Sequence, residues 1–252
     1  SSKLLIKKTE SIFGKGWKPE IDTMDTFVCS SWYYLRYPNA QSHNAPFDQS
    51  RLDWLPVDTY IGGAEHATMH LLYARFITKA LRDFGYLKFN EPFTRLFHQG
   101  TITKDGVKMS KSKGNTVSPD EFIDQYGSDT FRAYLMFMGP FDEGGDWNDK
   151  GIKGVYKFLH RSWKLYFNNT NYSENTEDLF IIHSTIKNVT NNLENMKFNT
   201  AISRLMELVN HFYSKGLSDN YKDTFIQLLA PLAPHLSEEL WSQSHKDSVF
   251  LS

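Results

Sequence analysis

The sequence predicts an α/β region to about residue 150, followed by an all-α region that ends as an antiparallel helix bundle. Two observations lead to this fold class. The run "PVDTYIGG" is β-branched and aromatic, stops at two glycines, and precedes a long stretch without helix breakers. From Gly151 onward the apolar residues recur at helical spacing, without the alternation typical of strands.

The α/β region begins with "DTMDTFVCSSWYYLRYP", which predicts a helix ended by Pro38. Its apolar face would contain Met24, Phe27, Val28, Ser31 and Leu35. A polar loop follows to Pro56, then the strand "VDTYI", and then a helix from Ala64 to a C-cap at Gly85. A strand, a glycine turn and a helix are the βα unit of a partial Rossmann-like, nucleotide-binding parallel sheet, which binds ligands at the carboxyl ends of its strands.

The elements that follow are predicted from turn and capping signals. "FTRLFHQGTI" reads as a further strand, and "TITKDGVKM" as a hairpin turning at Asp105-Gly106. "SPDEFIDQYG" predicts a helix with Ser118 and Glu121 as a capping box, and "SDTFRAYLMFMG" predicts another. "FDEGGDWNDKG" is predicted as a turn. The bundle helices are expected in "VYKFLHRSWKLYF", "IIHSTIKNVTNNLENM", "TAISRLMELVNHFYSKG" and "FIQLLAPLAPHLSEELW".

Composition describes an ordinary globular protein. The 252 residues are 40% apolar and 15% aromatic, which is enough for buried cores, and the formal net charge is −1, so a basic site would have to be local. The single cysteine, Cys29, excludes a disulfide framework and indicates a reducing compartment. Apolar runs are too short to span a membrane, and a signal-peptide core is absent. We therefore expect a cytoplasmic protein.

The first chemical signal is the segment "YIGGAEH". Gly62 and Gly63 would let backbone approach a ligand where the next helix begins, although such glycines are often structural. His66 and His70 lie four residues apart on one helical face, joined by Tyr73 and preceded by Glu65. A metal site would need a third ligand, and no HExxH pattern exists, so no protein-bound metal is predicted. The histidines are either ordinary core or surface residues or part of a substrate pocket.

The second signal is "TKDGVKMSKSKGNTVSPDE", which places Lys108, Lys111 and Lys113 between a hairpin and a helix start. One interpretation is a solvated basic loop. The other is a mobile clamp for a polyphosphate, in which charges on flexible stems follow the negative charge of a leaving group. The small residues between the lysines would let such a loop close.

The order of residues favours the clamp, because "KMSKS" is a signature of class I aminoacyl-tRNA synthetases. The blocks "DTMDTFVCSSWYYLRYP", "VDTYIGGAEHATMHLLYARF", "HQGTITKDGVKMSKSKGN" and "YGSDTFRAYLMFMGP" resemble the bacterial leucyl-tRNA synthetases. "LAPHLSEELW" is similar to the anticodon-binding helical domain of that group. The resemblance implies three parts: 1–104 as the second half of a Rossmann-like catalytic domain, 105–150 as the KMSKS loop with stem-contact helices, and 151–252 as an incomplete anticodon-binding bundle.

Residue by residue, the resemblance also implies roles. Lys108 and Lys111 match the catalytic lysines that stabilise phosphate. ATP binding is implied for Gly62, Gly63, Glu65, His98, Gln99, Met109, Ser110, Lys111 and Ser112. Leucine binding is implied for Phe27, Ser30, Tyr33, Tyr60, His66 and His70. The implied partners are leucine, ATP with Mg²⁺, and tRNA(Leu), with a monomeric parent protein.

Two departures from the family follow. Cys29 stands where the family often has an acidic residue, so it receives no role. No "HIGH"-type motif and no inserted editing domain is found in these residues. We therefore expect a fragment of a leucine–tRNA ligase that is inactive by itself.

Two rival functions compete with this one. A non-catalytic tRNA-binding module is the alternative, supported by a recurrence of basic residues at helical spacing: Lys153, Lys157, His160, Arg161 and Lys164. A merely solvated helix face accounts for these residues slightly better. A dinucleotide-dependent oxidoreductase is rejected, because the glycine fingerprint with its downstream acid is absent.

Overall fold

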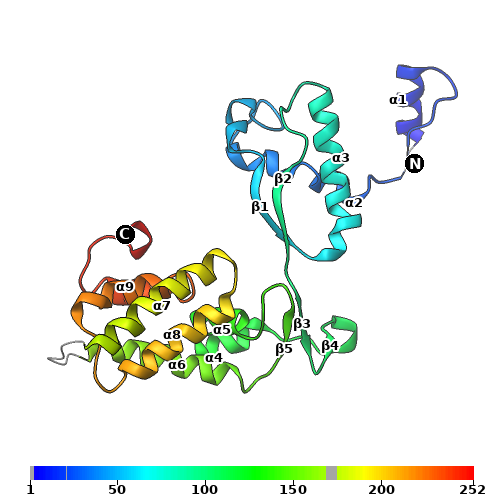
Figure 1. Ribbon diagram of the computed structural model, residues 1–252. Helices are drawn as coiled ribbons and strands as arrows, with labels where there is room; N and C mark the ends of the chain where they lie inside the picture. The colour runs from blue at the N-terminus through cyan, green and yellow to red at the C-terminus, as the bar shows by residue number, and fades with distance from the viewer. Residues whose placement is uncertain (1–2, 21, 169–174) are drawn as a thin grey trace. The chain divides into compact units, whose positions relative to one another are not determined.

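Figure 1 shows a computed structural model of the chain, which describes residues 3–20, 22–168 and 175–252. The chain divides into two compact units, Ser1–Phe97 and His98–Ser252, and each has its own buried core. Strands occur up to Trp147, and from Ile152 the described part of the chain is helical, which confirms the predicted class. The finer division at residues 104 and 150 stays a prediction.

The first unit is built on two neighbouring strands, β1 (Val57–Gly62) and β2 (Phe93–His98), which are connected through α3 (His70–Asp83). The backbone N–H of Val57, at the start of β1, donates to the Pro92 carbonyl just before β2 at 3.0 Å. Both strands therefore begin at the same end and run parallel, as a helical crossover requires. The predicted βα unit is confirmed. Gly85 follows α3 with a φ of +81°, the conformation expected of the predicted C-cap.

The remaining elements of this unit are short. They are α1 (Lys3–Phe13), α2 (Thr26–Ser30) and 3-10 helices at Tyr33–Leu35, Tyr37–Asn39, Gln49–Trp54 and Ala64–Thr68. The long helix predicted around Phe27 to Leu35 is wrong. The Ser31 hydroxyl donates to the Val28 carbonyl at 2.6 Å, and the chain then turns so that Tyr34 and Leu35 enter the core. Burial of these two side chains outweighs the helical periodicity.

Two further boundaries differ from the sequence-based expectation. The helix expected from Ala64 starts as a 3-10 turn, and Met69, with φ −115° and ψ −107°, separates it from α3. The strand expected over "FTRLFHQGTI" is two strands, because β2 ends at His98 and β3 (Thr101–Lys104) joins a different sheet. At the second boundary the strand propensity is correct, and the pairing partner changes from one sheet to the other.

The second unit begins with a three-stranded sheet. β3 pairs antiparallel with β4 (Val107–Lys108), and Asp105 and Gly106 turn between them with φ +54° and +73°. This confirms the predicted two-residue hairpin turn. β3 also pairs in parallel with β5 (Gly144–Trp147), which the sequence analysis placed in a turn. That interpretation is wrong, because β5 depends on a partner more than 40 residues away and not on its own propensity.

Helices make up the rest of the unit. They are α4 (Pro119–Tyr126), α5 (Ser128–Phe137), α6 (Ile152–Phe167), α7 (Thr176–Glu194), α8 (Phe198–Phe212), α9 (Asp219–Leu229) and α10 (Pro234–Trp241). They bury a common core that includes Ile152, Ile202 and Phe212. None of the described helices is long and apolar enough to span a membrane.

Two predictions about helix ends are corrected. Ser118 is the N-cap of α4 and Pro119 is at its first turn, but the Ser118 side chain makes no capping bond, so the predicted capping box does not form. A capping box forms instead at α7, between Asn175 and Asp178. The helix expected over "FIQLLAPLAPHLSEELW" is divided into α9 and α10, because Pro234 lacks the N–H that a continuous helix requires.

Candidate functional site

In the first unit, side chains from β1, α3 and the turn after α2 form a hydrogen-bonded chain. The hydroxyls of Tyr33 and Tyr60 lie 2.6 Å apart, and the Tyr60 hydroxyl lies 2.8 Å from His70 Nε2. Tyr60 points from β1 and His70 begins α3, so the strand–turn–helix geometry brings them together. The Tyr33 and His70 rings are also in contact, with centroids 5.9 Å apart. Three of the predicted leucine-binding residues therefore form one network.

Phe27 and His66 extend this cluster. The Phe27 ring meets the His66 ring edge-on at 6.1 Å, and the His66 and His70 rings are 6.3 Å apart. His66 Nδ1 is buried and has no hydrogen-bond partner among the described residues. A buried imidazole nitrogen without a partner costs free energy, so it marks a place where a ligand group or a water can bind.

Ser30 is the predicted leucine-binding residue whose side chain bonds to its own backbone turn and not to the aromatic cluster. Its hydroxyl donates to the Phe27 carbonyl at 3.3 Å, within the turn of α2. In this conformation the hydroxyl serves the local backbone. A direct role for Ser30 in ligand binding stays a prediction.

Burial sets the charge state of the network. It lowers the pKa of His70, with the neighbouring His66 adding to the effect. Burial also raises the pKa of Tyr60, and its hydrogen bond with Tyr33 raises it further. At neutral pH both side chains are therefore uncharged. Such a cluster of neutral aromatic rings suits an apolar side chain better than a charged one.

Two further aromatic residues contribute, and the sequence analysis assigned a leucine-binding role to neither. Phe93, on β2, stacks on Tyr60 with ring centroids 3.7 Å apart and an interplanar angle of 2°. Tyr73, on α3, contacts Phe27 at 6.0 Å. Tyr73 follows His66 and His70 at helical spacing, and that spacing places it on their helical face. Phe93 is adjacent only because β1 and β2 are neighbours in the sheet.

The glycine turn lies directly after Tyr60 in the chain. A side chain at Gly62 would meet nothing within 4 Å, so the space beside it is open. A Cβ at Gly63 would overlap the Glu65 carboxylate, which folds back over this backbone. The turn thus presents bare backbone and a carboxylate together. The predicted contact of Glu65 with a ribose stays a prediction.

In the second unit, the lysine segment forms a defined turn. Lys111–Lys113 is a 3-10 helix, and Ser110 Oγ accepts from the Lys113 N–H at 3.3 Å. The Ser110 and Ser112 hydroxyls are 3.2 Å apart. Gly114 closes the turn with a φ of +66°. The structure therefore brings Met109 to Ser112 together, with Met109 packed on the helical core.

The charged groups of this turn face solvent. Lys108, Lys111 and Lys113 are all exposed. Asn115, which sequence reasoning did not identify, holds the turn from inside. Its Oδ1 accepts from the Ser110 N–H at 2.9 Å, and its Nδ2 donates to the Lys108 carbonyl at 3.3 Å. Because the turn is already ordered, its lysine side chains can bind an anion without a further entropy cost for ordering the backbone.

The hairpin is anchored on β5. Asp146 Oδ1 accepts from the Thr103 hydroxyl at 2.6 Å and from the Gly106 N–H at 2.9 Å. These bonds hold the pKa of Asp146 below its ordinary value, the Thr103 bond having the largest effect. The next residue, Trp147, is buried against Phe122 and Tyr134. The lysine turn is thus connected to the helical core through β5.

Close backbone approach allows this sheet to form. A Cβ at Gly100 would overlap the backbone of Glu143 and Gly144, and one at Gly139 would overlap the Gly144 carbonyl. Gln99 lines a cavity of about 200 Å³ beside these glycines. His98, the other residue expected to approach the nucleotide here, is half-buried at the end of β2. The nucleotide roles of both stay predictions.

Metal-ligating residues do not gather in the part of the chain that is described: no group of three histidine, cysteine, aspartate or glutamate side chains is placed to bind an ion. Cys29 is exposed.

Comparison with known proteins gives two family matches. Residues 8–146 match the family "tRNA synthetases class I (I, L, M and V)", and residues 179–252 match "Anticodon-binding domain of tRNA ligase". The chain is similar to leucine–tRNA ligases of bacteria. It is 54% identical to that of Clostridium beijerinckii over 95% of this chain, and 48% identical to that of Thermotoga maritima over 96%.

Among solved structures, the chain is similar to the agnB2 LeuRS of Agrobacterium radiobacter K84, crystallised as a LeuRS–tRNA–LeuAMS ternary complex. The TM-score is 0.83 and the identity 38%, over 97% of this chain and 36% of that one. The chain spans about a third of the length of the relatives it matches: 32% of the Clostridium protein and 33% of the Thermotoga protein.

Proposed function

Because the chain belongs to the class I tRNA synthetases of the isoleucine, leucine, methionine and valine group, we propose that it is part of a leucine–tRNA ligase. Its whole enzyme would activate leucine with ATP and transfer it to tRNA(Leu). The observation that carries this proposal is the ordered lysine turn on β3, β4 and β5, in a chain 48–54% identical to leucine–tRNA ligases. The neutral aromatic cluster in the first unit supports the choice of leucine.

The reaction follows from the groups at hand. The leucine carboxylate attacks the α-phosphate of ATP in line, forming leucyl-adenylate and releasing pyrophosphate. The adenylate then transfers its acyl group to the terminal ribose of the tRNA. No protein nucleophile is needed, so catalysis rests on positioning and on stabilising the leaving pyrophosphate. Mg²⁺ accompanies ATP as part of the substrate.

Each cluster has a part in this scheme. The exposed ammonium groups of Lys108 and Lys111 stabilise the negative charge that develops on the pyrophosphate. The Gly62–Gly63 turn and the Glu65 carboxylate receive the adenosine, with the carboxylate accepting from ribose hydroxyls.

The aromatic cluster receives the amino acid. Tyr33, Tyr60 and His70 form its hydrogen-bonded wall, and Phe27 and His66 extend it. Neutral rings around an isobutyl group supply apolar contact. One methylene in such a pocket is worth only about 1–3 kcal/mol of discrimination.

Leucine-dependent exchange of pyrophosphate into ATP tests the proposal in the full-length enzyme that contains this segment. We expect exchange with leucine, and much weaker exchange with isoleucine, valine or methionine. Exchange that prefers another of these amino acids would overturn the assignment to leucine. We also propose that the 252 residues alone do not catalyse exchange, because they contain the lysine motif without a HIGH-type motif. Exchange by the isolated chain would contradict that point.

The second candidate is a non-catalytic module that binds tRNA. The anticodon-binding match over residues 179–252 supports it. It predicts tRNA binding by a full-length protein that never exchanges pyrophosphate. We further propose a monomeric, cytoplasmic parent. The exposed Cys29 is in keeping with a reducing compartment only.

A further inference from the structure

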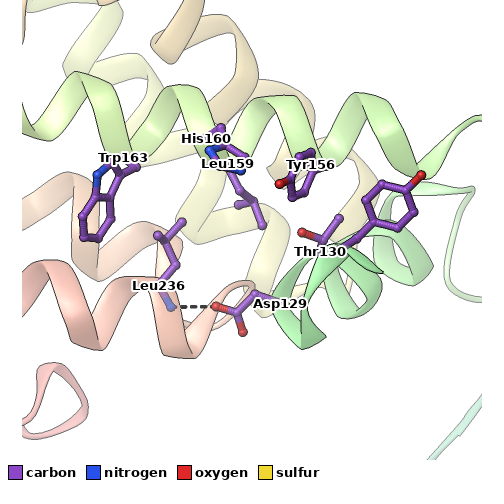
Figure 2. A pocket seen from close by; sticks show the side chains of 8 residues that line it. Asp129, Thr130, Tyr156, Leu159, His160, Trp163 and Leu236 are labelled. Carbon is purple, nitrogen blue, oxygen red and sulfur yellow. Dashed lines mark hydrogen bonds between the residues drawn. The ribbon is translucent and has the colours of Figure 1, made fainter. Parts of the chain in front are cut away.

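A cavity of about 330 Å³ opens among the helices of the second unit (Figure 2). In Figure 2, Tyr156, Leu159 and Trp163 of α6 point toward Leu236 of α10 and Thr130 of α5. Its volume is at the low end of the roughly 300–1,000 Å³ of ligand pockets. The space suits one planar ring system with a small substituent.

The lining is mainly aromatic and apolar. Tyr126 and Tyr156 meet edge-to-face at 5.4 Å, and the His160 ring lies 4.4 Å from Tyr156. The carboxylate in the lining belongs to Asp129, and it is already paired. It accepts from the Leu236 N–H at 2.7 Å and lies 2.8 Å from His235 Nδ1. The cavity therefore offers ring faces for stacking, while its negative charge is used in holding α10.

Beside the cavity lies a row of basic residues. Lys153, Lys157, His160 and Lys164 recur at intervals of four, three and four, so they share one face of α6, and all are exposed. In the part of the chain that is described, none of these lysines forms an ion pair. Tyr156 and Trp163 occupy the adjoining face, and His160 belongs to both. The ring faces and the free positive charges are thus neighbours along a single helix.

We propose that this cavity binds one unstacked base of an RNA loop, and that the lysines of α6 bind the adjoining phosphates. Aromatic faces stack any base, and a row of cations follows the backbone, so the two features together match single-stranded RNA. A purely apolar ligand would not use the lysines, and duplex RNA would not use the cavity. The proposal depends on the proposed function in one respect: the RNA is taken to be tRNA(Leu).

The test measures binding of a tRNA(Leu) transcript to the full 252-residue chain at several salt concentrations. Tyr156→Leu removes the ring and should weaken binding roughly 5- to 100-fold, with an unchanged salt dependence. Tyr156→Phe keeps the ring and should bind like the wild type. Lys157→Gln with Lys164→Gln should reduce the slope of log K against log salt by about 1–2. Lys187→Gln, an exposed lysine on α7, is the matched control and should change the slope little.

Base-specific chemical probing of the bound transcript gives a readout that needs no variant. One loop base should become protected by the wild-type chain and by Tyr156→Phe, and should stay reactive with Tyr156→Leu. Absence of such protection, equal binding by Tyr156→Leu, or no binding at low salt would each overturn the proposal. Binding of an aromatic small molecule or a peptide in place of RNA would also overturn it. Pyrophosphate exchange does not require this cavity. Absence of exchange in the full-length enzyme would therefore overturn the proposed function and leave the RNA result standing.

Discussion

Asp146 accepts a hydrogen bond of 2.6 Å from the hydroxyl of Thr103, which lies 43 residues earlier in the chain. This bond and the one from the Gly106 N–H join the lysine hairpin to β5. The first prediction is that Asp146→Ala loosens the hairpin. Amide exchange at Lys104 and Lys108 should accelerate roughly tenfold, because the acceptor of two bonds is lost.

Asp142→Ala, an exposed acid in the preceding loop, is the control and should leave exchange unchanged. The pKa of Asp146 is lowered in the folded state, so the bond is present above the ordinary carboxyl range. It should be lost as the pH falls through the lowered value. Equal amide exchange in Asp146→Ala and wild type would show that the β3–β5 pairing is enough to hold the hairpin in place without the Asp146 side chain.

The second prediction concerns Lys111. In the full-length enzyme, Lys111→Ala should lower the rate of adenylate formation about 10²–10³-fold, the scale for one transition-state donor. The KM for leucine should change little, because leucine would bind elsewhere. Lys113→Ala, in the same 3-10 turn, is the matched control and should have a much smaller effect. An unchanged pyrophosphate-exchange rate would remove Lys111 from the mechanism.

The third prediction tests the aromatic network. Tyr60→Phe removes the hydroxyl between Tyr33 and His70, so unfolding of the first unit should become easier by about 1–3 kcal/mol. The KM for leucine should rise about five- to tenfold. Tyr34→Phe is the control, because Tyr34 is buried and its hydroxyl lies 2.6 Å from that of Thr78. It should lower stability to a similar extent and leave the KM unchanged. If Tyr60→Phe and Tyr34→Phe have the same KM for leucine, the hydrogen-bonded network does not contribute to leucine binding.

The fourth prediction concerns Asp178, which is fully buried at the start of α7. Burial acts to raise its pKa, but the bonds from Lys215 at 2.7 Å and His211 at 2.6 Å hold the pKa below its ordinary value. Asp178→Asn should therefore destabilise the second unit by about 1–3 kcal/mol at pH 7.

The sign of the pH dependence follows from the lowered pKa of Asp178. Its contribution to stability is present above the ordinary carboxyl value of about 3.9 and is lost as the pH falls through the lower folded value. The difference in urea midpoint between wild type and Asp178→Asn should thus shrink below about pH 4. A difference that persists at pH 2 would show that the carboxylate charge is not responsible.

The fifth prediction compares the two units. The buried core described in the first unit consists of Tyr34, Leu35 and Leu87, whereas the helices of the second unit bury a much larger cluster. Hydrogen exchange should therefore show β1 and α3 opening more readily than α6 and α8. Equal protection in the two units would mean that stability does not follow the size of the buried cluster.

The sequence by itself predicted the βα unit, the Asp105-Gly106 hairpin and most bundle helices. These elements depend on neighbours in sequence: on periodicity, on glycines that permit a positive φ, and on residues that begin or end helices. The lysine turn and the pair of histidines were also found this way, because their residue types and spacing are local features.

The tertiary structure decided the elements that need a distant partner. β5 is a strand because Gly100, Gly139 and Gly144 let backbones approach, and the predicted helix after Phe27 is broken because Tyr34 and Leu35 are buried. Phe93 and Asn115 join the sites through a neighbouring strand and a turn that closes on itself. Burial and long-range pairing contribute more free energy at these positions than local propensity does, so the sequence pattern alone could not predict them.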